Sequence, residues 1–506
     1  MRAKFILIWA LLIPSALAQK PLWEGQFNAG PLWGGMDLRI SGNTVEARFT
    51  PWGQTITPKL ENIHLASNTI SFATEIDEKP FAFQGKLHGE NWTGTMSSSQ
   101  LQGAWRLTKI QQPNLSSHNT LPAAIGPYSI ARQTFDWTDN TREELDTKTA
   151  GDHRELLVYL YYPAKCPATG THVPYMPDAQ IMDKDWTPQQ IEEAKHLTTH
   201  ACADAPVISD RDFPLLLFMP GSGQRALAYS ALIENAASSG YVVAAIDPPY
   251  NASALQFPDG RVVRRLPPDQ RSWEIAKSHD DAPRIYKQLV TYWCKDMSFV
   301  LDQLQSLQQQ QNPLASAIDF SRVGAFGHSR GGSTAGRIRL LDSRIRAAIN
   351  IDGNIRGVPF PPEENDKGGK QPFLWLEKQI PWPNASQLKQ MGLTHEQMED
   401  MLGEGDRLLS TIPSDAYHVV IAQPGIDHLD FSDQAMFDSK LTQGELAQKL
   451  RTLEIARIYV TLFFDAYLKG TPSNFHKDFE KENRRFAETK ILFPTSAGVV
   501  AAHQSQ

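Results

Sequence analysis

The chain has 506 residues, of which 41% are apolar and 21% charged, and its formal net charge is −7. This length indicates more than one domain, and the composition is that of a globular protein with a sizeable core. Because there is no basic excess, a nucleic-acid partner is not expected.

Residues 1–18 have the pattern of a secretory signal peptide. Two basic residues precede an apolar run at 5–13, and residues 16–18, with Ala16 and Ala18, form a small-x-small cleavage site. The alternative is a buried N-terminal helix. The run is too short to cross a bilayer about 30 Å thick, and no other apolar run is long enough. We therefore expect an exported protein, periplasmic or secreted, with no integral membrane span after signal removal.

Three cysteines follow the signal peptide. Export would place them in an oxidising compartment, where disulfides persist. Cys166 and Cys202 flank one long polar segment, so we expect them to pair. Cys294 lies in a stretch of helical pattern and is expected to be buried.

Residues 20–110 form a predicted β-rich accessory domain. Short alternating runs, such as 44–49 and 69–73, are separated by Gly, Asn and Pro, which is typical of a meander, sandwich or small barrel. The region has no catalytic motif, so a packing role is favoured over substrate binding. Residues 111–122 have the composition of a linker.

Residues 123–490 form the predicted catalytic domain, in which strands alternate with helices. This alternation predicts an α/β fold with a mostly parallel central sheet. A long helix at Glu445–Lys469 is expected to close the domain, and residues 387–409 are expected to form a cap. The predicted strands are Leu156–Tyr162, Pro214–Met219, Tyr241–Ile246, Val323–Phe326, Ala347–Ile351, Phe373–Leu376 and His418–Ala422.

The segment 327–331 fits the pattern G-x-S-x-G, with Ser329 at its centre. It follows a predicted strand and precedes a helical pattern at 333–341. A sharp strand-to-helix turn of this kind exposes a serine hydroxyl in the α/β-hydrolase fold. We therefore predict Ser329 as a nucleophile; the alternative is a glycine-rich structural turn.

A serine nucleophile needs a histidine base and a carboxylate that orients it, in the chain order Ser, acid, His. His428 follows the last predicted strand in a loop at the carboxyl edge of the sheet, where such sites form. Asp352 and Glu377 each end a predicted strand. The residues alone leave the acid open between these two, with Asp352 favoured.

The oxyanion donors should be backbone N–H groups. One follows the nucleophile, at Arg330, and the other comes from the turn after an early central strand. That turn is 219–223, and we favour the N–H of Ser222. This chemistry needs no metal and no cofactor, and the sequence has no clustered zinc-type ligand set.

Over roughly residues 121–470, the sequence resembles the plasma-type platelet-activating-factor acetylhydrolases and their bacterial esterase relatives. The segments that carry the resemblance are 213–223, 238–247, 299–304, 327–332 and 428–433.

The resemblance implies that the acid follows the strand after the elbow helix, which favours Asp352 over Glu377. The chain departs from the family pattern at two positions. Pro220 replaces the first residue of a His-Gly pair, and Arg330 stands where a hydrophobic residue often follows the serine. The Arg330 side chain could bind an anionic substrate group, although a structural ion pair is the commoner role. The segment between Asp352 and His428 is also longer than the family leads us to expect.

These features predict a serine hydrolase that cleaves small-molecule carboxylic esters through an acyl-enzyme. The resemblance further implies short acyl chains and a place in lipid degradation. Three alternatives stay open: an amidase, peptidase or thioesterase on the same fold, a polymer- or glycan-targeted esterase that uses residues 20–110 as a binding module, and a non-catalytic binding protein. The sequence carries no indication of an oligomeric state.

Overall fold

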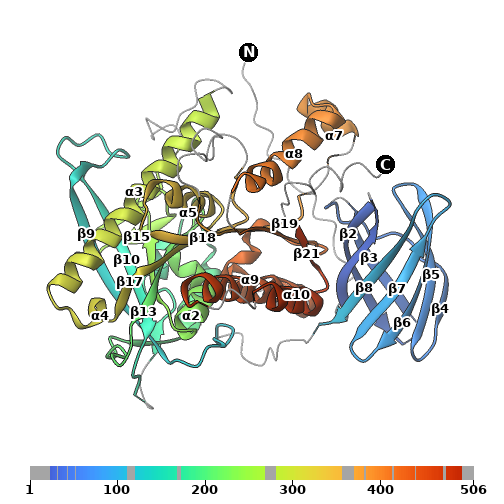
Figure 1. Ribbon diagram of the computed structural model, residues 1–506, viewed down its shortest axis with the longest axis horizontal. Coiled ribbons are helices and arrows are strands. Elements are labelled where there is room, and N and C mark those ends of the chain that lie inside the picture. The colour runs from blue at the N-terminus through green and yellow to red at the C-terminus, as the bar shows by residue number, and fades with distance from the viewer. Residues whose placement is uncertain are drawn as a thin grey trace.

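The computed structural model describes residues 23–30, 32–42, 44–51, 53–110, 120–167, 172–267, 281–355, 370–380, 383, 385–412, 415–438, 440–470 and 475–492. The predicted signal peptide and residues 111–119 of the predicted linker lie outside them. Figure 1 shows an N-terminal sheet on one side of a larger domain in which helices cover a second sheet.

The N-terminal region is an antiparallel sheet in the order β3-β2-β1-β8-β7-β6-β5-β4. Alternate residues of its strands are buried, as in β5, where Ile70 and Phe72 face the core and Thr69 is exposed. The strands are β1 (Trp23–Ala29), β2 (Leu32–Ser41), β3 (Thr44–Pro51), β4 (Glu61–Leu65), β5 (Thr69–Ile76), β6 (Lys79–His88), β7 (Asn91–Ser97) and β8 (Gln102–Lys109).

This sheet curls around its own core. β3 and β6 are separated in the sheet by β2, β1, β8 and β7, and strands lie about 4.8 Å apart, so a flat sheet would place them more than about 20 Å apart. The rings of Phe49 on β3 and Phe83 on β6 nevertheless have centroids 5.4 Å apart. The inward-facing side chains therefore share one core.

The larger domain contains an 11-stranded sheet in the order β11-β12-β9-β10-β14-β13-β17-β18-β19-β20-β21. Every strand predicted for this domain is present, whereas β9, β11, β12 and β21 were not predicted. The strands are β9 (Ile130–Glu143), β10 (His153–Pro163), β11 (His172–Pro174), β12 (Thr198–Ala203), β13 (Phe213–Met219), β14 (Val242–Asp247), β17 (Ile318–His328), β18 (Ile345–Ile351), β19 (Phe373–Lys378), β20 (Ala416–Ile421) and β21 (Thr489–Leu492), with a separate hairpin of β15 (Ala254–Gln256) and β16 (Val262–Arg264).

The sheet is mixed. Strands β14 to β20 run parallel at its centre, whereas β10 pairs antiparallel with β9 and β14, and β21 pairs antiparallel with β20. The expected parallel arrangement is therefore restricted to the centre, because the flanking strands return as hairpins or from the end of the chain.

Helices cover both faces of the central strands. In β13, Leu216 and Phe218 belong to one core cluster, and Leu215 and Leu217 belong to another. Successive side chains of a strand point to opposite faces of the sheet, so a strand covered on both faces contributes to two cores. The helices are α1 (Pro188–His196), α2 (Ser230–Ser238), α3 (Asp281–Gln309), α4 (Pro313–Ser316), α5 (Arg330–Leu341), α7 (Ala385–Met391), α8 (His395–Ser410), α9 (Gln443–Leu468) and α10 (Phe475–Arg485), with 3-10 turns η1 (Ala179–Met182), η2 (Ala226–Tyr229), η3 (His428–Phe431) and η4 (Asp433–Phe437).

The segment predicted as a cap contains α7 and α8. Parallel strands need a crossover connection, and α8 supplies it between β19 and β20. A Cβ added to Gly405 would lie 2.4 Å from the ring of Trp375 on β19, so glycine allows the helix to approach the sheet closely. The cap role expected for this segment stays a prediction for α7 and the start of α8.

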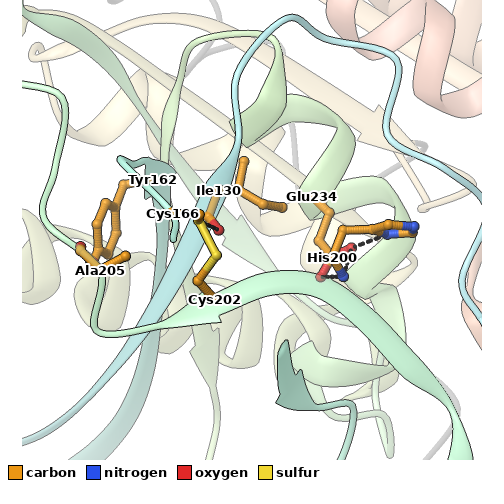
Figure 2. Close-up of a disulfide and its surroundings, with 7 residues drawn as sticks. All are labelled: Ile130, Tyr162, Cys166, His200, Cys202, Ala205 and Glu234. Atoms are coloured by element: carbon orange, nitrogen blue, oxygen red, sulfur yellow. Dashed lines mark hydrogen bonds and ion pairs between the residues drawn. A yellow bond between two sulfur atoms is a disulfide. The ribbon is translucent and has the colours of Figure 1, made fainter. Parts of the chain in front are cut away.

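The disulfide between Cys166 and Cys202 is present, at a sequence separation of 36, and it links the segment after β10 to β12 (Figure 2). The predicted pairing is confirmed. Cys294 is a buried free thiol, as expected. Among the described residues, no helix has the length and apolar character needed to cross a membrane.

Candidate active site

Ser329 lies at the turn between β17 and α5, with φ 55° and ψ −122°. A positive φ is costly for a residue with a side chain, by about 1–3 kcal/mol, and such strain is concentrated at functional positions. The Ser329 N–H donates to the carbonyl of Ile351 at 2.8 Å. This bond ties the strained turn to the end of β18, the neighbouring strand.

The glycines on either side of Ser329 are required by close packing. A Cβ added to Gly331 would lie 2.0 Å from the carbonyl oxygen of Met219, and one added to Gly327 would lie 2.5 Å from the carbonyl carbon of Gly331. Both contacts are with backbone atoms, which cannot move aside easily. The G-x-S-x-G spacing therefore follows from how tightly α5 turns back over β13 and β17.

Asp352 and His428 are brought together from different strands. Asp352 directly follows β18, and its Oδ2 lies 2.5 Å from Nδ1 of His428. Its Oδ1 accepts a second hydrogen bond, from the Lys378 N–H at 3.0 Å. The Asp352 side chain is 6% exposed and that of His428 is 41% exposed. The carboxylate is thus buried and held at two points, and the imidazole opens toward solvent.

Glu377, the other possible acid, is engaged elsewhere. It lies in β19, and its Oε1 is 3.0 Å from Nε2 of His418, while Nδ1 of His418 is 2.7 Å from Asp406 on α8. Burial lowers the pKa of His418, but hydrogen bonds to Asp406 and Glu377 outweigh it and raise the pKa to about 9. Glu377 therefore belongs to a buried ion-pair cluster that holds α8 on the sheet.

His428 begins the turn η3, which is closed by its own neighbours. The Asp427 side chain accepts from the Leu429 N–H at 3.2 Å, and the Asp427 N–H donates to Asp430 at 2.8 Å. Asp430 is also bonded to Lys449 at 2.6 Å. These two aspartates therefore shape the turn that carries the imidazole.

The turn after β13 lies against the serine. A Cβ added to Gly221 would be 3.3 Å from the Ser329 Cβ. The Gly221 N–H donates to the Tyr229 hydroxyl at 3.3 Å, and the Gly223 N–H donates to the Asn251 carbonyl at 2.9 Å. The N–H of Ser222, between them, has no acceptor among the described residues, so it is available to a ligand.

His328 is a site residue that the sequence analysis missed. Its ring lies 4.4 Å from that of His428, and its Nδ1 is 2.7 Å from the Tyr229 hydroxyl. Burial, followed by the neighbouring imidazole of His428, lowers the pKa of His328 well below the usual range. It is therefore a neutral ring that packs against the ring of His428. The feature of the sequence that could have identified His328 is its position in the G-x-S-x-G motif, directly before Ser329.

The Arg330 side chain is used within the fold. Its Nη1 donates to the Asn251 side chain at 3.0 Å, and its guanidinium lies 5.4 Å from the centre of the Trp293 ring. Because the Asn251 carbonyl also accepts from Gly223, Asn251 links the elbow to the turn after β13. This arrangement favours the structural role for the side chain.

Among the described residues, His328, Asp352 and His428 are a set of potential metal ligands whose atoms lie within 4.8 Å of one another. The set contains the Asp-His pair described above. Oδ1 and Oδ2 of Asp352 already accept hydrogen bonds from the Lys378 N–H and from His428. The prediction that no metal is needed stays a prediction.

The comparison with known families is consistent with this geometry. The sequence model of the family "platelet-activating factor acetylhydrolase, isoform II" matches residues 114–487, which include all of these site residues. The chain belongs to this family.

Two curated relatives illustrate the relationship. The platelet-activating factor acetylhydrolase of Cavia porcellus is 22% identical over 308 residues, 53% of this chain and 64% of that protein. The "Probable 1-alkyl-2-acetylglycerophosphocholine esterase" of Arthroderma benhamiae is 25% identical over 285 residues, 52% of this chain and 66% of that protein. The chain thus spans slightly less than two thirds of the length of these relatives.

A solved structure, the ferulic acid esterase from Streptomyces cinnamoneus, aligns with a TM-score of 0.57 and 25% identity. The alignment covers 74% of this chain and 100% of that one. The acetylhydrolase-family domain therefore has the α/β-hydrolase fold, preceded here by an antiparallel β domain.

Proposed function

We propose that this protein hydrolyses carboxylic esters through an acyl-enzyme on Ser329. The observation that carries the proposal is the strained elbow at Ser329, whose N–H is bonded to the end of β18 directly before Asp352, the carboxylate that lies 2.5 Å from Nδ1 of His428. Membership in an acetylhydrolase family supports a small-molecule ester substrate.

In the proposed mechanism His428 accepts the proton of the Ser329 hydroxyl as the serine attacks the ester carbonyl. Asp352 keeps the His428 proton on Nδ1, so that Nε2 is free to act as the base. The N–H groups of Ser222 and Arg330 stabilise the oxyanion. His428 then protonates the leaving alkoxide and activates the water that releases the acid.

The oxyanion site has support from the hydrogen-bond pattern around the turn 220–223. Tyr229 and Asn251 occupy the flanking N–H groups and fix the turn, while the Ser222 N–H keeps its donor capacity. Burial raises the pKa of the Tyr229 hydroxyl, which therefore stays protonated. Since this hydroxyl accepts from Gly221, its own proton is directed to Nδ1 of neutral His328.

Labelling with a fluorophosphonate probe tests the nucleophile directly. Mass spectrometry of the labelled protein should place the adduct on Ser329, and His428→Ala should slow labelling by at least about 10³-fold, because the serine loses its base. Labelling of another residue, or equal labelling of His428→Ala, would contradict the assignment.

The finer substrate assignment is part of the proposal. The names of the relatives favour short acyl chains and a place in lipid degradation, and the predicted signal peptide favours an exported enzyme. An amidase, peptidase or thioesterase would use the same groups. A panel of acetyl esters, amides and thioesters separates these reactions by their kcat/KM values.

A polymer-targeted esterase is a second candidate, favoured by one observation. The face of strands β4 to β7 carries a hollow of about 1050 Å³ whose lining includes Ser71, Gln84, Lys86 and Thr93. Hydroxyl, amide and ammonium groups of this kind can bind a polyhydroxylated chain. Co-sedimentation of Ser329→Ala with insoluble polysaccharides tests this role, and its absence for every polymer would leave the hollow without a ligand.

A further inference from the structure

The loop from the end of β20 to His428, residues 422–428, lies against the N-terminal domain. Figure 1 shows the N-terminal strands next to β21, the neighbour of β20. The Gly425 N–H donates to the Thr55 Oγ1 at 3.1 Å, and the Gln423 Nε2 donates to Glu24 at 3.0 Å. The loop that carries the proposed base is therefore bonded to a domain that has no catalytic motif.

The contact also involves the backbone. A Cβ added to Gly35 on β2 would lie 2.0 Å from the carbonyl oxygen of Ala422, the first residue of the loop. The Ala422 N–H donates to the Glu488 carbonyl at 2.8 Å. The start of the loop is thus enclosed between β2 and the chain that leads into β21.

Glu24 is the buried centre of this interface. Its side chain is bonded to the amide groups of Gln423 and of Gln448 on α9. Gln423 in turn donates to the Gln448 carbonyl at 2.9 Å and accepts from Thr452 at 2.6 Å. Burial, and then the charges of Glu488 and Asp37, raise the pKa of Glu24 to about 8. At neutral pH its carboxyl is therefore largely uncharged, and each of its oxygens accepts from one of the two side-chain amides.

Gln54, which is next to Thr55 in the chain, contacts the segment predicted as a cap. Gln54 donates to Gln387 on α7 at 3.1 Å. Gly425 is separated from His428 by only two residues, and the Ile426 N–H donates to Gln423 in a tight turn. A shift of residues 423–425 would therefore be passed directly to the imidazole.

We propose that the N-terminal domain is a positioning element of the active site, in which Glu24 and Thr55 hold the loop 422–428 so that His428 stays aligned with Asp352 and Ser329. This role rests on the proposed function. It assigns to the domain a contribution to kcat that neither passive packing nor polymer binding would give.

Substitutions in the full-length protein test this role. Glu24→Ala removes the acceptor for the two glutamines, and Thr55→Val removes the acceptor for Gly425 while keeping the side-chain shape. We expect kcat for p-nitrophenyl acetate to fall about tenfold or more in the first and about threefold in the second, with KM nearly unchanged. Thr55→Ser, which keeps the acceptor for Gly425, should keep kcat near the wild-type value, and Glu24→Gln, which keeps one of the two acceptor oxygens, should lose less than Glu24→Ala. Thr44→Val, at the exposed start of β3, is the matched control.

All measurements are made well below the melting temperature of each variant, so that a stability loss alone does not lower kcat. If Glu24→Ala does not fold, the Thr55→Val and Thr55→Ser pair decides. Folded Glu24→Ala and Thr55→Val with wild-type kcat would overturn the positioning role. An inactive wild type, or an active Ser329→Ala, would instead overturn the proposed function.

Discussion

Replacing Asp352 by asparagine should remove most of the activity without disturbing the fold. The carboxylate accepts from His428 at 2.5 Å and from the Lys378 N–H at 3.0 Å. Asparagine has one acceptor oxygen, which the fixed backbone N–H of Lys378 will occupy. Its NH₂ group then faces Nδ1 of His428 and favours the tautomer with the proton on Nε2, which cannot accept the Ser329 proton.

The expected loss is about 10⁴-fold in kcat, equivalent to about 5.5 kcal/mol of transition-state stabilisation. The assay is steady-state hydrolysis of p-nitrophenyl acetate at neutral pH. Glu377→Gln is the matched control, because Glu377 is bonded to His418; it should lose stability but keep kcat. A kcat for Asp352→Asn within about tenfold of wild type, or an equal loss in Glu377→Gln, would refute the assignment of the acid.

Three further predictions concern the buried ion-pair cluster of His418, the turn after β13 and the disulfide. The pKa of His418 is raised from 6.5 to about 9, so protonated His418 contributes about 3 kcal/mol to the free energy of unfolding below pH 6.5, and this contribution is lost as the pH rises through 9. In urea unfolding, the stability difference between wild type and His418→Gln should shrink across that pH range. A stability difference that does not depend on pH would contradict this prediction. Tyr229→Phe should lower kcat about tenfold, because the turn after β13 loses a hydrogen bond; a folded variant with wild-type kcat would argue against this role. Loss of the disulfide in Cys166→Ser/Cys202→Ser, which closes a loop over a separation of 36 residues, should cost about 3–4 kcal/mol, and an unchanged unfolding midpoint would be inconsistent with that estimate.

The central strands were predictable because both of their faces are covered, which produces continuous apolar runs such as that in β13. The strand β9 was missed because six of its 14 residues are exposed, and its polar positions look like a loop. β21 was missed because it is a short strand that pairs with β20 from the end of the described chain. Neither has a local pattern that reveals its partner.

Motif and chain order were enough to propose the serine and the histidine, whereas the residues alone left the acid open between Asp352 and Glu377. Asp352 and Glu377 come at the ends of neighbouring strands, but their side chains point in different directions. Asp352 follows β18 and turns with a φ of 49° toward His428. Glu377 is still in β19 and faces His418 on the adjacent strand. The sequence does not encode that difference locally.

The support from the N-terminal domain was also not predictable, because it depends on contacts between distant segments. Glu24 and Gln423 are 399 positions apart in the chain, and neither belongs to a motif. The N-terminal region was therefore interpreted as an accessory domain on composition alone. Its contact with the loop 422–428 is seen only in the folded structure, where both sheets have formed.

The most direct test of the central claim is hydrolysis of p-nitrophenyl esters from acetate to palmitate by the mature protein and by Ser329→Ala. The account predicts activity on the short esters that falls by at least about 10⁴-fold in Ser329→Ala, to the background that binding and the oxyanion donors alone provide. No hydrolysis of any ester by the folded wild type, or undiminished hydrolysis by Ser329→Ala, would contradict it.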